Sequence, residues 1–139
     1  MPGVTLDGME VSAETLAKVP GENLRVSRTE FGAVWAMVEE WGSQPGPDND
    51  YLIGVLRTCR WLADQPVWSG FLGRAEMPPA PVTRREHAAM PETIDAEYLA
   101  AVSPRAPEPD VAQGVAATLE WTWHGSRRPP LEIPHAAAG

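Results

Sequence analysis

The amino-acid sequence predicts an all-α fold, a small bundle of four to five helices with proline-rich extended segments. Two observations predict it. Apolar residues recur at the spacing of one helix face in several segments, and helix-capping residue types stand where these segments begin. The 15 prolines fall between these segments or at their starts. Since proline cannot continue a helix, the prolines divide the chain into short helices.

We expect the 139 residues to form a single domain. It divides into an N-terminal arm (1–24), a first helix pair (25–64), a packed proline-rich connector (65–82), a second helix group (83–124) and a proline-rich tail (125–139). Within the arm, Asp7-Gly8 predicts at most a short hairpin at 4–11. Residues 12–19 predict a two-turn helix capped by Ser12.

The first helix pair has the strongest helical pattern. One helix is predicted at 28–41, because Ser27 and Glu30 form a capping box before an apolar face of Phe31, Val34, Trp35, Val38 and Trp41. A second is predicted at 50–64, with an apolar face of Leu52, Val55, Leu56, Cys59 and Leu62. Two prolines in the short connection predict an antiparallel hairpin of helices. Glu39 and Glu40 are expected on solvated faces.

The connector at 65–82 is predicted to be extended and packed on the helices. It combines four prolines with large apolar residues, Trp68, Phe71 and Leu72. A free linker would be more polar.

The second helix group begins with another capping box, Thr83 and Glu86, which predicts a short helix within 83–90. Pro91 then opens a helix at 92–102 that carries Ile94, Tyr98 and Val102 on one face. The last helix is predicted at 110–123, with Asp110 as its cap and Gly125 as its stop.

The motif G-V-x-x-T-x-x-W occurs twice, at Gly54, Thr58 and Trp61 and again at Gly114, Thr118 and Trp121. Residues at this spacing share one helix face. A glycine inside a helix costs about 1 kcal/mol relative to alanine, and it often allows another backbone to come close. We therefore predict that the two helices cross at their glycines, flanked by the tryptophans. The alternative is that each glycine is merely tolerated. Whether or not the helices cross, the repeat is also compatible with an ancient duplication that gives two pseudo-repeated helix pairs.

The chain carries no recognisable catalytic or metal-binding pattern. Cys59 lies between two arginines but on an apolar face, so it is predicted to be a buried structural cysteine. His87, His124 and His135 do not have the spacing of metal ligands. No phosphate-binding or nucleophile motif is present. We predict no cofactor and no metal. The sequence leaves open whether the protein is an enzyme, and the absent motifs weigh against it.

The net charge of −8 is spread along the chain, which disfavours direct nucleic-acid binding. No run of 18 apolar residues is present, so we predict no membrane span. The N-terminus lacks the pattern of a signal peptide, and a cytoplasmic location is the simplest expectation.

Tryptophan and arginine suggest a contact surface. Trp121 and Trp123 cannot both face inward on one helix, so at least one is expected near the surface. The candidate interface residues are Trp68, Phe71, Trp121, Trp123, Arg127 and Arg128. Stacking of arginine on tryptophan within the monomer is the alternative.

These observations favour a non-enzymatic helical protein that acts through protein–protein contacts, with either a partner protein or a second copy. One alternative is a small enzyme or ligand-binding domain whose site assembles only in the fold. Another is an acidic mimic of nucleic acid or a regulatory protein.

Overall fold

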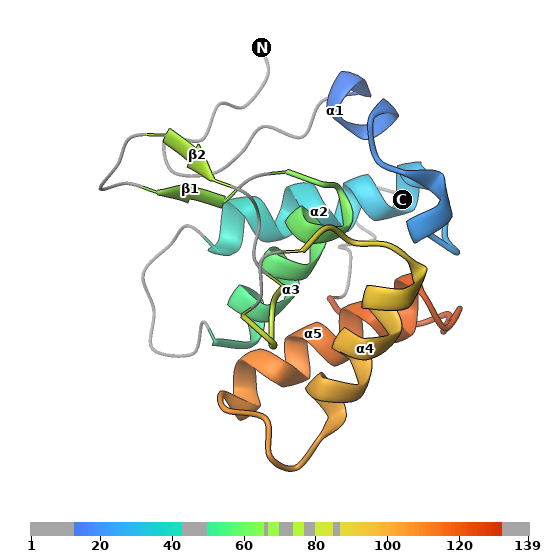
Figure 1. Ribbon diagram of the computed structural model, residues 1–139. Coiled ribbons are helices and arrows are strands. Elements are labelled where there is room, and N and C mark those ends of the chain that lie inside the picture. Colours follow the sequence, from blue (N-terminus) through green and yellow to red (C-terminus); the bar gives the residue numbers. More distant parts are fainter. Residues whose placement is uncertain are drawn as a thin grey trace.

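The computed structural model describes residues 13–42, 50–65, 67–69, 74–76, 80–84 and 87–131 (Figure 1). The helices are α1 (Ala13–Ala17), α2 (Arg28–Gly42), α3 (Asp50–Leu62), α4 (Pro91–Val102) and α5 (Pro109–Thr122), with a 3₁₀ turn η1 (Gly21–Asn23). Two short strands, β1 (Val67–Ser69) and β2 (Arg74–Glu76), form an antiparallel pair. The predicted all-α fold class is confirmed.

Helix α3 lies in the middle of the bundle. It packs against α2 on one side and α5 on the other, and α4 packs on α5 (Figure 1). The core is built from the apolar stripes of these helices. It includes Phe31, Val34, Trp35 and Val38 of α2, Val55, Cys59 and Leu62 of α3, Ile94 of α4, and Val111, Val115 and Leu119 of α5.

Helix ends follow the predicted signals at several positions. The Glu30 backbone N–H donates to Ser27 Oγ at 3.1 Å, so Ser27 caps α2 as expected. Gly125 has a φ of 75° just beyond α5, a left-handed conformation that suits glycine. Asp110 is not the cap of α5, because the helix begins at Pro109 and Asp110 lies in its first turn. A carboxylate there still favours the helix through its dipole.

The prediction of a helix within 83–90 is wrong. Residues 81–83 form a turn, residues 87–90 have no regular secondary structure, and Arg84 has a φ of 59°. The Thr83 hydroxyl donates to Glu97 Oε1 of α4 at 3.2 Å instead of capping a helix. Helix α4 has its own cap, since the Met90 backbone N–H donates to Thr93 Oγ1 at 2.9 Å. A tertiary contact thus overrides the local capping signal.

Some predictions fall outside the described residues. They are the hairpin at 4–11, the cap at Ser12, the side chains of Trp41 and Trp68, and residues Phe71, Leu72, Glu86 and His135. At the end of the connector, Ala80 and Val82 are buried. In the described part of the chain, every helix is too short or too polar to cross a bilayer.

Candidate interaction surface

The repeated motif brings α3 and α5 into backbone contact. A methyl group added to Gly54 would overlap the carbonyl oxygen of Val111 and lie 3.1 Å from Gly114 Cα. A methyl group added to Gly114 would overlap the carbonyl oxygen of Tyr51 and lie 3.1 Å from Gly54 Cα. The two helices therefore cross at these glycines, where neither backbone leaves room for a side chain.

The other motif residues play matching parts in the two helices. The Thr58 hydroxyl donates to the Gly54 carbonyl at 2.7 Å, and the Thr118 hydroxyl donates to the Gly114 carbonyl at 2.7 Å. Both threonines are buried, and each hydroxyl finds its acceptor one turn back in its own helix. Trp61 and Trp121 are buried as well. The motif residues thus belong to the interior, where they fix the position of α5 against α3.

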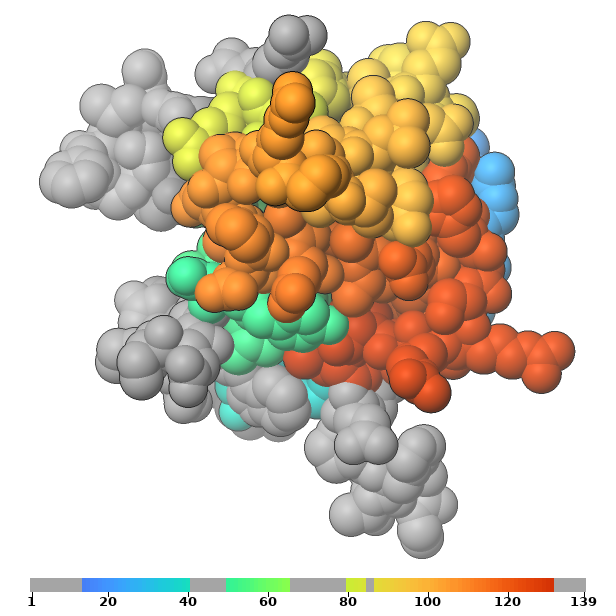
Figure 2. All heavy atoms as spheres, turned by 90° about the horizontal axis from the view of Figure 1, so that it is seen from below, coloured from blue at the N-terminus to red at the C-terminus, as the bar shows by residue number. Residues whose placement is uncertain are grey.

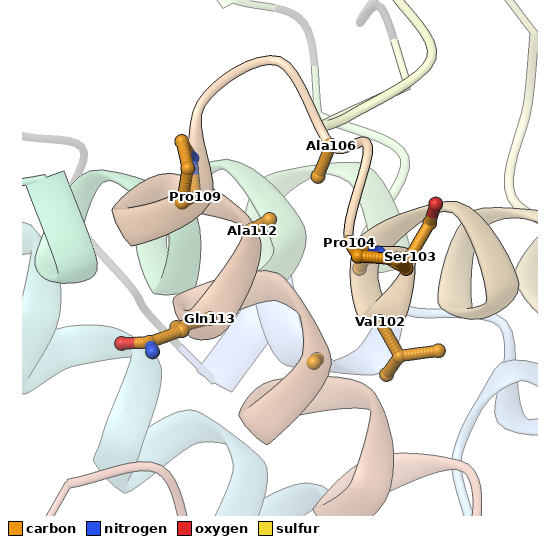
Figure 3. Close-up of a pocket in the computed structure, with 9 residues that line it drawn as sticks. Val102, Ser103, Pro104, Ala106, Pro109, Ala112 and Gln113 are labelled. Carbon is orange, nitrogen blue, oxygen red and sulfur yellow. The ribbon is translucent and has the colours of Figure 1, made fainter.

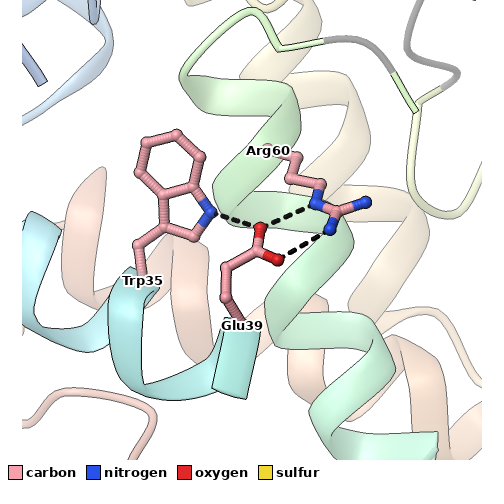
Figure 4. Close-up of polar contacts among 3 residues, drawn as sticks. All are labelled: Trp35, Glu39 and Arg60. Atoms are coloured by element: carbon pink, nitrogen blue, oxygen red, sulfur yellow. Dashed lines mark hydrogen bonds and ion pairs between the residues drawn. The ribbon is translucent and has the colours of Figure 1, made fainter. Parts of the chain in front are cut away.

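A polar cluster joins α2 to α3 (Figure 4). The Arg60 guanidinium donates to both oxygens of Glu39, each at 2.7 Å, and Trp35 Nε1 donates to Glu39 Oε2 at 2.9 Å. Glu39 is only 2% exposed, so the expectation that it faces solvent is wrong. The three side chains are directed at one another, and the cluster ties two helices together. Its sequence signal is the spacing of four residues between Trp35 and Glu39 on one helix face.

Cys59 is fully buried, as its place on the apolar face predicts. Burial, with a smaller contribution from the negative charge of Glu39, raises the pKa of the Cys59 thiol. The thiol therefore stays protonated in the core at neutral pH.

The two described histidines each lie against an aromatic ring. His87 contacts the edge of Trp61, with ring centroids 5.7 Å apart, and His124 lies 4.4 Å from the centroid of Tyr98. Within the described ranges, no three His, Cys, Asp or Glu side chains come together as metal ligands would.

Four of the six predicted interface residues have side chains that the structure describes: Trp121, Trp123, Arg127 and Arg128. Trp121 is 3% exposed, so it is a core residue and not part of a surface. Trp123 is partly exposed; its Nε1 donates to Asp95 Oδ1 at 2.7 Å, and the Arg25 guanidinium lies 4.2 Å above its ring. Arg127 and Arg128 are exposed. Stacking within the monomer is therefore observed, and its arginine comes from the turn before α2.

Within the described ranges, the exposed large apolar residues are Met90, at the N-cap of α4, and Leu99 and Val102 of α4 itself. Leu99 is 66% exposed and Val102 is 47% exposed. Val102 also borders a pocket of about 370 Å³ between the end of α4, the following loop and the start of α5 (Figure 3). The lining is Ala101, Val102, Ser103, Pro104, Ala106, Pro109, Ala112, Gln113 and Ala116. We call Leu99 together with this pocket the α4–α5 face; Figure 2 shows these helices, in yellow to red, over a broad part of one side of the molecule.

A polar aromatic group lies at the other end of the same helix pair. The Tyr98 hydroxyl donates to Glu120 Oε2 at 3.1 Å, and His124 packs against the Tyr98 ring. Burial, and then the hydrogen bond and negative charge of Glu120, raise the pKa of Tyr98, so this hydroxyl stays protonated as a donor. Aromatic side chains with a polar tip suit a contact surface.

Sequence reasoning missed this surface because it misassigned the buried face of α4. The prediction placed Ile94, Tyr98 and Val102 on one face, but the buried stripe is Ile94, Glu97 and Ala101. A glutamate in the middle of a core stripe conceals that stripe from a hydrophobic pattern. The signal that could have revealed the surface is Leu99, an apolar residue left over on the opposite side of the helix.

Comparison with known proteins adds no relative from which a role could be inferred. No family model, curated protein or solved structure matches the chain. The fold and the site define a small helical protein with an exposed apolar face. Any functional assignment therefore rests on the chain's own geometry.

Proposed function

We propose that this protein is a non-enzymatic interaction protein whose contact surface is the α4–α5 face. One observation carries the proposal: Leu99 and Val102 are largely exposed beside an apolar pocket. Apolar side chains scattered singly on a surface need no explanation, but apolar groups gathered around a concavity are typical of binding surfaces. Full burial of an aliphatic side chain contributes roughly 1.5–3 kcal/mol, so these two residues are natural anchors.

The chemistry of the pocket lining supports binding without catalysis. Its side chains come from alanine, proline, valine, serine and glutamine, none of which titrates near neutral pH. General acid–base catalysis needs a group that can hold or release a proton. Cys59 and the described histidines lie outside the lining. These features favour the interaction function over the enzyme alternative.

The aromatic group beside the face suits the rim of an interface. Tyr98, Trp123 and Arg25 are of the residue types enriched at protein–protein contacts. They are already held by Glu120 and Asp95, so a partner would meet side chains that are largely ordered in advance. Such preorganisation lowers the entropic cost of binding.

The proposal is tested by capture from a lysate of the source cells with the tagged, full-length chain. Leu99→Glu places a charge at the centre of the face, and Ala36→Glu places the same charge on an exposed position of α2. We expect proteins that bind the parent chain, including its endogenous copy, to bind Ala36→Glu and to be lost from Leu99→Glu. Circular dichroism verifies that both variants are folded. Equal capture by Leu99→Glu and the parent chain would refute the proposal, as would no capture by the parent.

A further inference from the structure

We infer that the occupant of the α4–α5 face is a second copy of this chain, with α4 packed antiparallel against α4 of that copy. The inference rests on the proposed function and adds the identity of the partner. It is carried by the order of charged and apolar residues along the exposed side of α4 and by the pocket beside them.

The exposed side of α4 changes character from one end to the other. Glu92, Asp95, Leu99 and Val102 are spaced by three or four residues, so they follow one face of the helix, and all four are exposed. Beyond the helix end, Arg105 is exposed between two lining residues of the pocket. From Glu92 to Arg105, the order is therefore acidic, then apolar, then basic.

An interface about a two-fold axis uses the same patch on both subunits, so the patch must complement itself. An antiparallel α4 pair meets this requirement. The apolar middle of one copy faces the apolar middle of the other, and the acidic start of each helix approaches Arg105 of the opposite copy. A parallel arrangement would instead bring like charges together.

The shape of the α4–α5 face is also self-complementary. Leu99 protrudes one turn before the pocket, which is lined mainly by alanine and proline side chains. In the antiparallel pair, Leu99 of each copy points toward the pocket of the other. A pocket of about 370 Å³ is large enough to receive an aliphatic side chain. The protruding Leu99 and the pocket that could receive it thus lie on the same patch, as a two-fold contact requires.

The surrounding charges leave Arg105 available for this role. Arg84, on the other side of the loop, pairs with Glu108 at 2.7 Å. Arg105 forms no ion pair with any residue in the described ranges. The overall charge of −8 opposes association, but at physiological salt charges separated by more than about 8 Å are largely screened. The local pairs across the contact therefore decide the arrangement.

The length of α4 limits the strength of the dimer. Twelve residues span about 18 Å at 1.5 Å per residue, which makes for a small contact. We therefore expect a reversible dimer that dissociates on dilution, below the size class of stable interfaces.

Charge exchange between two variants tests the arrangement. Asp95→Arg cancels the charge of Glu92 and removes the net negative charge at the start of α4, and Arg105→Asp leaves two acidic ends. Sedimentation velocity of the purified full-length chain, over a range of concentrations, should show dimers for the parent and at least about tenfold weaker dimers for each variant alone. An equimolar mixture of the two variants should recover the association of the parent, because in the mixed dimer the charges at positions 95 and 105 are again opposite in both contacts.

Asp95 accepts a hydrogen bond from Trp123, so Glu92→Arg serves as a second variant that leaves that bond in place. A parent chain that is monomeric at every concentration would overturn the inference. So would a mixture that associates no better than the single variants, or a dimer that is insensitive to Arg105→Asp. If the parent is monomeric but captures another protein through Leu99, only the identity of the partner fails. If it is monomeric and captures nothing, the proposed function fails with it.

Discussion

Gly54 and Gly114 are the positions at which the backbones of α3 and α5 touch. Replacement of either glycine by alanine sets two effects against each other. Alanine favours the helix by about 1 kcal/mol. The added methyl group, however, meets a backbone carbonyl of the facing helix, which cannot move without shifting that helix.

We therefore predict that Gly54→Ala and Gly114→Ala each lower the free energy of unfolding by roughly 1–3 kcal/mol. Gly32→Ala is the matched control in α2, because the atoms nearest to its methyl group would belong to the flexible side chain of Leu16. Gly32→Ala should lower the free energy of unfolding by less than either crossing variant does. Urea denaturation of the three variants measures these free energies of unfolding. If both crossing variants are more stable than the parent, the close approach is not a structural requirement.

At the scale of single residues, the buried apolar positions could be predicted from the sequence and the buried polar positions could not. Cys59 is buried because its neighbours on the helix face are apolar, which the sequence displays. Glu39 and Glu97 are buried because distant groups satisfy their oxygens, Arg60 in one case and Thr83 in the other. Such partners lie 21 and 14 residues away, beyond the reach of a local pattern.

At the scale of an element, the turn at 81–83 depends on one buried carboxylate of α4. Glu97 accepts hydrogen bonds from the backbone N–H groups of Val82 and Thr83 and from the Thr83 hydroxyl. Burial raises the pKa of Glu97, although these hydrogen bonds and the nearby His87 act in the opposite direction. The folded protein thus holds a proton on this group at a pH where the unfolded chain has released it.

Stability should therefore fall as pH rises from the ordinary carboxyl value, 4.5, through the raised pKa of Glu97. Glu97→Gln cannot titrate, so its free energy of unfolding should fall less steeply across this pH range than that of the parent. Glu22→Gln, at an exposed position of η1 outside the α4–α5 face, is the control and should keep the slope of the parent. Urea titrations at a series of pH values give the three slopes. A slope for Glu97→Gln equal to that of the parent would contradict the assignment.

The helices themselves were predictable because their signals are local. The expected range 28–41 became Arg28–Gly42, and 92–102 became Pro91–Val102. The false helix within 83–90 shows the limit of such signals. Thr83 and Glu86 have the spacing of a capping box, but the Thr83 hydroxyl bonds to Glu97, and the chain turns where a helix would start.

At the scale of the whole molecule, the glycine crossing determines which surface is presented. Close contact with α3 fixes α5, and α5 carries α4 on its outer side (Figure 1). With Glu97 turned inward, Leu99 is directed outward. The sequence predicted the crossing helices but not this outcome, because the exposed side of α4 depends on a buried glutamate and its distant partners.

The central claim, that the protein meets its partner through the α4–α5 face, is tested most directly by photo-crosslinking. A benzophenone amino acid replaces Leu99 in one variant and Ala33, an exposed residue of α2, in the other. Upon irradiation of the source cells, position 99 should give a crosslinked species, either with a second copy or with another protein, and position 33 should give none. Equal yields from the two positions, or crosslinks from position 33 alone, would contradict the account.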